Sequence, residues 1–238
     1  MRLIKVGATL LMLAMATAVS AQELTFVTAD DMAPWSMEKG DKKGIAVEVM
    51  NALAKQTGVT LKIQFEPWGR AKQIATEGKN IVIMPLIRSP EQEKNYTWLG
   101  TLKTVETHFV TTTGKSYDLE SAKALGSVLV SPGTPMVKFL ENAGFKNLDK
   151  VGESTVQVKK LAMGRADAWY IPDINAKWIW KSQNIQNTMT NGPSISKQET
   201  YLGMSPGADP ALAKKLGDAL EAMKKDGTLD RIIDSYTK

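Results

Sequence analysis

The segment Leu86–Lys94, with the sequence LIRSPEQEK, carries the strongest local signal in this chain of 238 residues. It follows an apolar run that predicts a strand. Ser89 is a favoured helix N-cap, Pro90 suits the first helical position, and Gln92 completes a capping box. The segment therefore predicts a strand that leads into the N-terminus of a helix. The free N–H groups there, beside the guanidinium of Arg88, favour a site for the negative or polar end of a small molecule, or else a plain surface helix.

Strands and helices alternate on both sides of this segment, with short connections. Apolar alternation predicts strands at 24–28, 61–65, 81–84, 107–112, 128–130, 166–171 and 198–204. Apolar residues at helical spacing predict helices at 45–57, 67–78, from 89 onward, and at 134–140, 154–163, 212–223 and 229–233. This alternation is typical of an α/β layer with a largely parallel sheet. A second α/β lobe that begins near residue 110 fits the pattern better than one continuous sheet.

The N-terminus has the pattern of a secretory signal peptide at residues 1–21. Arg2 and Lys5 precede a short apolar run, and a small-x-small sequence ends at Ala21, after which cleavage is predicted. The run is too short to span a bilayer. Because the chain also has no Cys, we expect a soluble protein of the bacterial periplasm without disulfides.

The charges and the rare residue types exclude several classes of protein. The formal net charge of +5 falls to +3 once Arg2 and Lys5 leave with the signal, and the remaining lysines are spread along helices. Solvated helix faces explain this distribution better than a nucleic-acid groove does. A single His and no Cys give no basis for a metal cluster, and no nucleotide-binding fingerprint is present. We expect no cofactor, no metal and no nucleic acid.

The order of several short motifs resembles the extracytoplasmic (periplasmic) solute-binding proteins of family 3, the polar-amino-acid type that serves ABC transporters. These motifs are Pro-Trp at 34–35, Arg-Ser-Pro-Glu-Gln-Glu at 88–93, Ser-Pro-Gly-Thr at 131–134, Gly-Arg-Ala-Asp-Ala at 164–168 and Lys-Asp-Gly-Thr-Leu-Asp-Arg at 225–231. The resemblance covers essentially the whole mature chain. It implies an α/β, two-lobed periplasmic-binding-protein fold of type II. By that analogy, lobe 1 is 22–108 plus 203–238, lobe 2 is 109–202, and the hinge strands lie near 107–112 and 198–204.

The same resemblance implies what the protein does. A small solute would bind between the lobes, closure would bury it, and an ABC permease or a membrane sensor would recognise the closed form. We expect a monomer without catalytic activity. The first alternative is an enzyme on the same scaffold, similar to the cyclohexadienyl dehydratases, with Glu66 or Glu91 as the general acid. The second is a module that has lost its ligand and serves only protein interactions.

Two positions depart from the family pattern. Members that bind α-amino acids usually hold the ligand carboxylate with an Arg where this chain has Gln92, and the ammonium with an Asp where it has Pro172. An unpaired carboxylate in a closed cleft costs several kcal/mol. Either Arg88 or Arg70 takes over the anion and Asp173 the cation, or the ligand is not a standard α-amino acid. We favour the second explanation slightly.

The remaining candidates are aromatic side chains and the loop before the helix at 134–140. Aromatic rings suit an apolar, aromatic or cationic solute, although each ring would equally suit a lobe core. Asp173 would equally suit an N-cap, and we assign Trp178 and Trp180 to packing and His108 to the hinge. The full set of candidate ligand-binding residues is Trp35, Trp68, Arg70, Arg88, Ser89, Gln92, Gly133, Thr134, Trp169, Tyr170 and Asp173.

Overall fold

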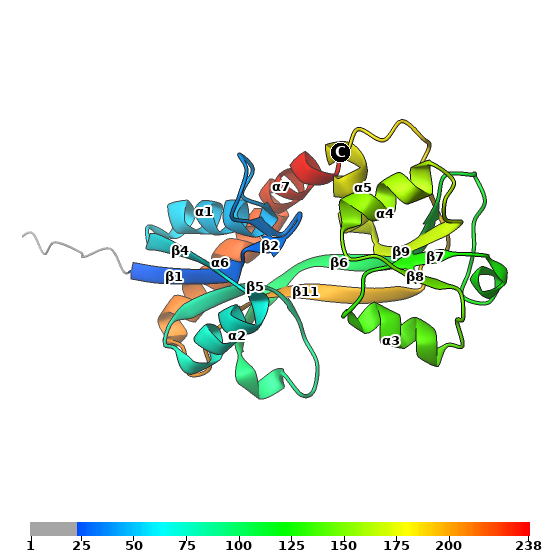
Figure 1. Cartoon of the computed structure of the whole chain (residues 1–238). Helices are drawn as coiled ribbons and strands as arrows, with labels where there is room; N and C mark the ends of the chain where they lie inside the picture. Colours follow the sequence, from blue (N-terminus) through cyan, green and yellow to red (C-terminus); the bar gives the residue numbers. More distant parts are fainter. Residues whose placement is uncertain (1–22) are drawn as a thin grey trace, which may run out of the picture.

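A mixed sheet runs from one end of the molecule to the other (Figure 1). The computed structural model describes residues 23–238, so the predicted signal peptide lies outside the described residues. The strands of the sheet follow the order β4-β1-β5-β11-β6-β9-β7-β8, and β10 pairs with β6. Their bounds are β1 Glu23–Ala29, β4 Thr60–Glu66, β5 Ile81–Ile87, β6 Thr97–Thr111, β7 Val128–Val130, β8 Leu148–Lys150, β9 Ala168–Pro172, β10 Thr190–Asn191 and β11 Ser196–Met204. A separate small ribbon joins β2 (Asp31–Met32) to β3 (Ser36–Met37).

Helices cover both faces of this sheet in two groups (Figure 1). The first group, with β1, β4 and β5, forms what we call lobe 1, and its helices are α1 Ile45–Thr57, α2 Trp68–Glu77, α6 Pro210–Lys225 and α7 Thr228–Thr237. The second group, with β7, β8 and β9, forms lobe 2, and its helices are α3 Pro135–Asn142, α4 Ser154–Ala162 and α5 Asp173–Ser182. Two short 3₁₀ turns, Glu93–Asn95 and Ser121–Ala124, complete the described elements.

The two lobes share one hydrogen-bonded sheet, which corrects the expectation of two separate sheets. Strands β4, β1 and β5 are parallel in lobe 1, and β9, β7 and β8 are parallel in lobe 2. The antiparallel pair β6 and β11 joins them. Strand β6 begins at Thr97, ten residues before the predicted start at 107. At about 3.3 Å per residue it extends about 50 Å. Because it is this long, β6 pairs with β11 and then with β9 in lobe 2.

The prediction of an α-helix that begins at Ser89 is wrong. Only nine residues, 88–96, separate β5 from β6, and they form turns in which Gln92 N–H donates to the carbonyl of Ser89 and Asn95 N–H to that of Gln92. An α-helix of two or more turns would leave no chain to return into β6. The short 3₁₀ turn Glu93–Asn95 has no side-chain cap, and the length of the connection decides against a longer helix. By contrast, Asp209 caps α6 as sequence rules would have it, accepting from the N–H groups of Ala211 and Leu212.

Each lobe has its own buried core. In lobe 1 the largest cluster joins Leu24 and Phe26 of β1 to Leu216 of α6 and Tyr236 of α7. In lobe 2, two clusters lie against the common sheet, one around Trp169 and the other around Phe109. Within residues 23–238, no helix combines the length and the apolar character needed to cross a membrane.

Helix α5 of lobe 2 also packs directly against lobe 1. Ile174 is buried in the lobe 1 core, and the ring of Trp178 lies 5.4 Å from that of Tyr236 on α7. The side-chain amide of Asn175 donates to the carbonyl of Ala33 at 2.7 Å. We call these contacts of Ile174, Asn175 and Trp178 the interlobe seam. In this structure the seam joins the two lobes beside the strands that connect them.

Candidate ligand-binding cleft

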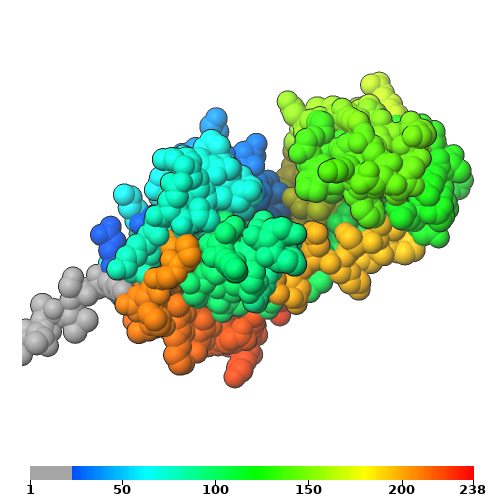
Figure 2. All heavy atoms as spheres, turned by 90° about the horizontal axis from the view of Figure 1, so that it is seen from below, coloured from blue at the N-terminus to red at the C-terminus, as the bar shows by residue number. Residues whose placement is uncertain are grey.

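A cleft of about 650 Å³ lies between the lobes, next to the interlobe seam. This volume is typical of sites for small molecules. Figure 2 shows a hollow between the two lobes, with the blue N-terminal part of lobe 1 at its inner end. Lobe 1 contributes Asp31, Met32 and Ala33, from β2 and the turn that follows it. Lobe 2 contributes the β7–α3 loop, the start of α4 and one face of α5, through Ser131, Thr134, Met136, Gly152, Glu153, Ser154, Thr155, Ile171, Pro172, Asn175, Trp178, Ile179, Ser182 and Gln183.

Hydroxyl groups line the lobe 2 wall of the cleft. Thr134 donates its hydroxyl to the carbonyl of Ser131 at 2.7 Å, which holds the loop before α3 in place. The hydroxyl of Ser131 accepts from the side-chain amide of Gln157, which is fully buried on α4. Ser131 therefore keeps its own hydroxyl hydrogen for a further acceptor. This wall can donate hydrogen bonds to a polar group in the cleft.

The charged lining of the cleft is entirely acidic. Asp31 of lobe 1 and Glu153 of lobe 2 line it, and the described lining contains no Lys, Arg or His. Both carboxylates are exposed, and neither forms an ion pair with a described residue. Apolar side chains, among them Met32, Trp178 and Ile179, make up much of the remaining wall. The cleft is therefore electronegative and partly apolar, without a counter-charge for a carboxylate.

Of the candidates from the sequence, only Thr134 lines this cleft. Gly133 precedes it in the same loop, exposed and with a φ of 71°. Trp68 and Arg70 lie in the first turn of α2 and do not line it. Trp68 packs against the buried cluster under α2, and exposed Arg70 donates to the side chain of Gln73 at 2.9 Å.

Arg88 is held within lobe 1 by partners of its own. Its guanidinium donates twice to the carboxylate of Glu93, at 2.6 and 2.8 Å, and lies 5.2 Å from the ring of Trp98 and 5.8 Å from that of Tyr201. The hydrogen bond to Glu93 raises the pKa of Arg88, and the same bond lowers the pKa of Glu93. We call Arg88, Glu93, Trp98 and Tyr201 the Arg88 cluster. Neither it nor the adjoining Ser89 and Gln92 belongs to the cleft lining.

The aromatic candidates Trp35, Trp169 and Tyr170 lie in lobe cores rather than in the cleft. Trp35 is 5% exposed in the core of lobe 1. Trp169 and Tyr170 alternate along β9, so that their side chains enter the two different cores of lobe 2. For these three residues, the packing alternative of the sequence analysis describes the structure.

Asp173 joins α5 to the central sheet. Its carboxylate accepts from the backbone N–H of Glu106 on β6 at 3.2 Å and pairs with Lys177 at 3.3 Å. It is the first residue of α5 rather than its N-cap, which is Pro172. Asp173 therefore has two partners within the chain, and a ligand cation would have to compete with both.

The two glutamates considered as general acids lie outside the cleft lining. A general acid at neutral pH requires a raised pKa. Glu91 is exposed, and a hydrogen bond with the side chain of Ser89 lowers its pKa. Glu66 accepts from the side-chain amide of Gln64 at 2.8 Å, at the end of β4. Neither residue lines the cleft.

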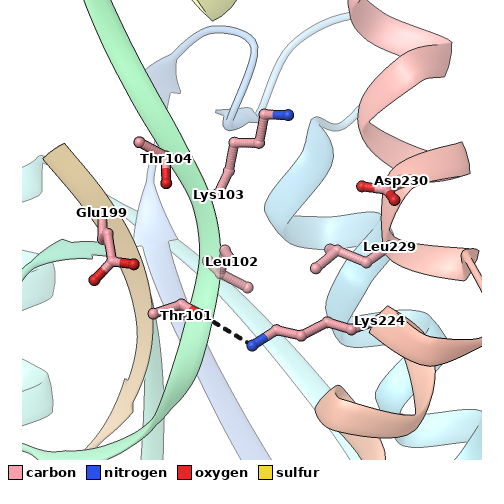
Figure 3. A pocket seen from close by; sticks show the side chains of 8 residues that line it. All are labelled: Thr101, Leu102, Lys103, Thr104, Glu199, Lys224, Leu229 and Asp230. Atoms are coloured by element: carbon pink, nitrogen blue, oxygen red, sulfur yellow. Dashed lines mark hydrogen bonds between the residues drawn. The ribbon is translucent and has the colours of Figure 1, made fainter. Parts of the chain in front are cut away.

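A second hollow, of about 270 Å³, lies where β6 and β11 pass α6 and α7 (Figure 3). Lys224 crosses it and donates to the hydroxyl of Thr101 at 2.9 Å, while Asp230 of α7 lies at its rim (Figure 3). None of α3, α4 and α5 contributes to this hollow. It is too small and too one-sided to be the site that two lobes close upon.

Among the polar cleft-lining residues that sequence reasoning missed are Asp31, Asn175 and Glu153. Asp31 stands three residues before Pro34, in the loop that carries the Pro-Trp motif at 34–35. Nothing in the local sequence distinguishes Glu153 from other exposed acids. Asn175 follows Asp173 by two residues, but its partner Ala33 is 142 residues away.

Comparison with known proteins agrees with the resemblance seen in the sequence. The model of "Bacterial extracellular solute-binding proteins, family 3" matches residues 24–238. The L-cystine-binding protein TcyJ of Escherichia coli (strain K12) is 25% identical over 209 residues, which cover 85% of this chain and 78% of that protein. The probable amino-acid-binding protein YxeM of Bacillus subtilis (strain 168) is 26% identical over 214 residues, which cover 84% and 77%.

A solved structure of similar fold is that of an ancestral cationic amino acid solute binding protein. It superposes with a TM-score of 0.78 at 20% identity, over 91% of this chain and 96% of that one. At this identity the likeness shows the fold alone. It confirms the predicted α/β, two-lobed fold of type II.

Proposed function

The chain belongs to the bacterial extracellular solute-binding proteins, family 3, and from this premise we propose that it captures a small solute in the interlobe cleft and presents it to an ABC importer or a membrane sensor. Family membership confirms the expectation of a binding protein rather than an enzyme. The observation that carries the proposal is the cleft itself, which is lined from both lobes and has the volume of a small-molecule site.

Movement of the lobes is the step that would couple binding to delivery. We propose β6 and β11 as the hinge, with the lobe boundaries near 108 and 203 that the family resemblance implies. A solute that touches Asp31 on one wall and Ser131 on the other gains its full contacts only when the lobes approach. Such a solute shifts the equilibrium towards the closed form, because it binds that form better.

The place of action in this proposal is the periplasm. The basic start, short apolar run and small-x-small sequence before Ala21 support export through a cleaved signal peptide. The partners would then be a permease or a sensor in the inner membrane, with the protein acting as a monomer.

The ligand in this proposal is not a standard α-amino acid. The family's carboxylate-binding Arg is replaced by Gln92, and Arg88 is already paired with Glu93. Relatives bind L-cystine or are named as amino-acid-binding, so an amino acid remains the obvious alternative for the test.

A thermal-shift screen of the purified protein tests the proposal. Amino acids, amines, small carboxylates, sugars and aromatic acids would each be added well above their expected Kd. A solute at 100 times its Kd stabilises the folded protein by about 2.7 kcal/mol, which a melting curve detects easily. Stabilisation by at least one solute, with a smaller radius of gyration in solution scattering, is the expected result. No response from any class, together with a stable protein partner, would favour the interaction module instead.

A further inference from the structure

We infer that the solute taken by this cleft is an organic cation without a free carboxylate, held between Asp31 of lobe 1 and Glu153 of lobe 2. The inference deepens the proposed function and rests on it, since it concerns the same cleft. It begins from the sign of the charges: two carboxylates line the cleft, one from each lobe, and no described lining residue carries a positive side chain.

The two carboxylates also differ from the other charged candidates in having no partner among the described residues. Arg88 is paired with Glu93, and Asp173 with Lys177 and the N–H of Glu106. Their charges are satisfied before any solute arrives. Asp31 and Glu153 are satisfied only by solvent, which closure would remove.

The charges of Asp31 and Glu153 disfavour closure of the empty cleft but favour closure around a bound cation. Bringing like charges together in a drying cleft is unfavourable, and the cost rises as water leaves. A cation between them reverses the sign of both interactions. The closed form is then favoured only when the cation is bound, which is the differential affinity that a ligand-driven closure requires.

The same lining argues against a zwitterion. A carboxylate that entered this cleft would face Asp31 and Glu153 with no guanidinium or ammonium to oppose them. The hydroxyl of Ser131 and the start of α4 offer hydrogen-bond donors, which are enough for a neutral polar group but weaker than an ion pair. The apolar side chains of Met32, Trp178 and Ile179 suit a methylene chain, and an indole ring also attracts cations.

The two acids are not expected to contribute equally. Glu153 is the N-cap residue of α4, where the positive end of the helix dipole offsets part of its charge. Asp31 lies in the short ribbon of β2 and β3 and is not itself part of a helix terminus. Asp31 should therefore be the stronger of the two counter-charges.

Matched pairs of probes test the class of ligand by isothermal titration of the full protein. Agmatine against arginine and cadaverine against lysine each compare the same side-chain cation with and without an α-carboxylate. We expect the decarboxylated member to bind at least about tenfold more tightly in each pair, a ratio that equals 1.4 kcal/mol. We also expect Asp31→Asn to weaken amine binding by about tenfold or more, and Glu153→Gln to weaken it less.

Asp230→Asn is the matched control, because it removes one carboxylate from the separate hollow of Figure 3. It should leave amine binding unchanged, and both neutralised cleft variants should still fold, as judged by their melting curves. Tighter binding of arginine and lysine than of their amines would overturn the inference while leaving the proposed function intact. So would binding of only neutral or anionic solutes, or an equal response to Ca²⁺ alone. A protein that binds no solute of any class would overturn both.

Discussion

The interlobe seam and the Arg88 cluster both gather aromatic and polar side chains, yet they differ in what they connect. In the Arg88 cluster, Arg88 meets Glu93, Trp98 and Tyr201, all within lobe 1 or the strands that leave it. In the seam, Asn175 and Trp178 of lobe 2 meet Ala33 and Tyr236 of lobe 1, and the same two residues line the cleft. The cluster is complete by itself, whereas the seam belongs to both lobes and to the site between them.

This difference shows what makes a site in a two-lobed protein. An arginine, a capping motif and two aromatic rings are strong local signals in the sequence. In the structure, however, the guanidinium is already bound to Glu93 and the two rings already pack against neighbours. Asn175 and Trp178 are weak signals locally, and their importance comes from partners more than 50 residues away. Changes in the seam should therefore affect both stability and binding, and loss of the exposed Arg88 guanidinium should affect neither.

The largest effect is expected from Trp178→Ala. Trp178 packs against the cores of both lobes and against the ring of Tyr236. Truncating an aromatic side chain in such a position costs about 3 kcal/mol of unfolding free energy. Urea unfolding measures the loss, and weaker solute binding should accompany it.

Trp180→Ala is the control for this change. Of the described hydrophobic clusters, Trp180 packs against one in lobe 2, and its indole N–H donates to the carbonyl of Asn187 at 3.0 Å. It does not line the cleft. An equal loss of stability and binding in both variants would mean that the seam has no special role.

A somewhat smaller effect is expected from Tyr236→Phe, at the lobe 1 end of the seam. The phenol of Tyr236 donates to the carboxylate of Glu48 and accepts from the N–H of Gly44 at 3.0 Å. Phenylalanine would leave both groups without this partner, at a cost of about 1–3 kcal/mol. Chemical unfolding at pH 7 measures it.

The same residue predicts a dependence on pH. Burial and the hydrogen bond to Glu48 raise the pKa of Tyr236 well above its ordinary value of 10.0. Above pH 10 the unfolded chain therefore releases this proton more readily than the folded one, so stability falls as the pH rises. In Tyr236→Phe, the unfolding free energy should decrease less steeply above pH 10 than in the wild type. Identical slopes above pH 10 in both proteins would contradict the assignment.

Much of the fold could be predicted because its signals are local. The apolar spacing of α1 and α6 and the glycine after α1 at Gly58 mark helices that the structure contains. The short apolar runs of β1 and β7 likewise mark strands. The family motifs then specify the two-lobed arrangement, which local patterns alone do not.

The failures share one physical cause, which is distance along the chain. The capping signal at Ser89 loses to the nine-residue limit between β5 and β6, a limit that depends on where β11 pairs. Trp35, Trp169 and Tyr170 enter cores because of helices that cover them from elsewhere in the sequence. The position of Thr134 in the cleft lining follows from local sequence, because a loop before a helix at the end of a parallel strand is a recurrent ligand position; its contact with a solute stays a prediction.

A modest effect is expected from Asn175→Ala. The change removes the hydrogen bond of 2.7 Å to Ala33, and with it a polar contact between the lobes. The expected loss is about 1 kcal/mol, measured by urea unfolding. Asn187→Ala is the matched control, since Asn187 is exposed and its hydrogen bond, to Ala162, stays within lobe 2. A larger loss in the control would remove the distinction between the seam and an ordinary surface contact.

The smallest effect is expected from Arg88→Gln, and it bears most directly on the comparison. Arg88 is exposed, and an exposed ion pair contributes little to stability. Its guanidinium is bound to Glu93 and lies outside the cleft lining, so no solute contact should be lost. The affinity for whichever solute the screen identifies should equal that of the wild type, whereas Asp31→Asn should weaken it. If Arg88→Gln instead abolished binding, Arg88 would have to leave Glu93 during closure and reach the solute. Arg88 would then supply a positive charge to the solute in the closed form, and the site would consist of the acidic cleft together with Arg88.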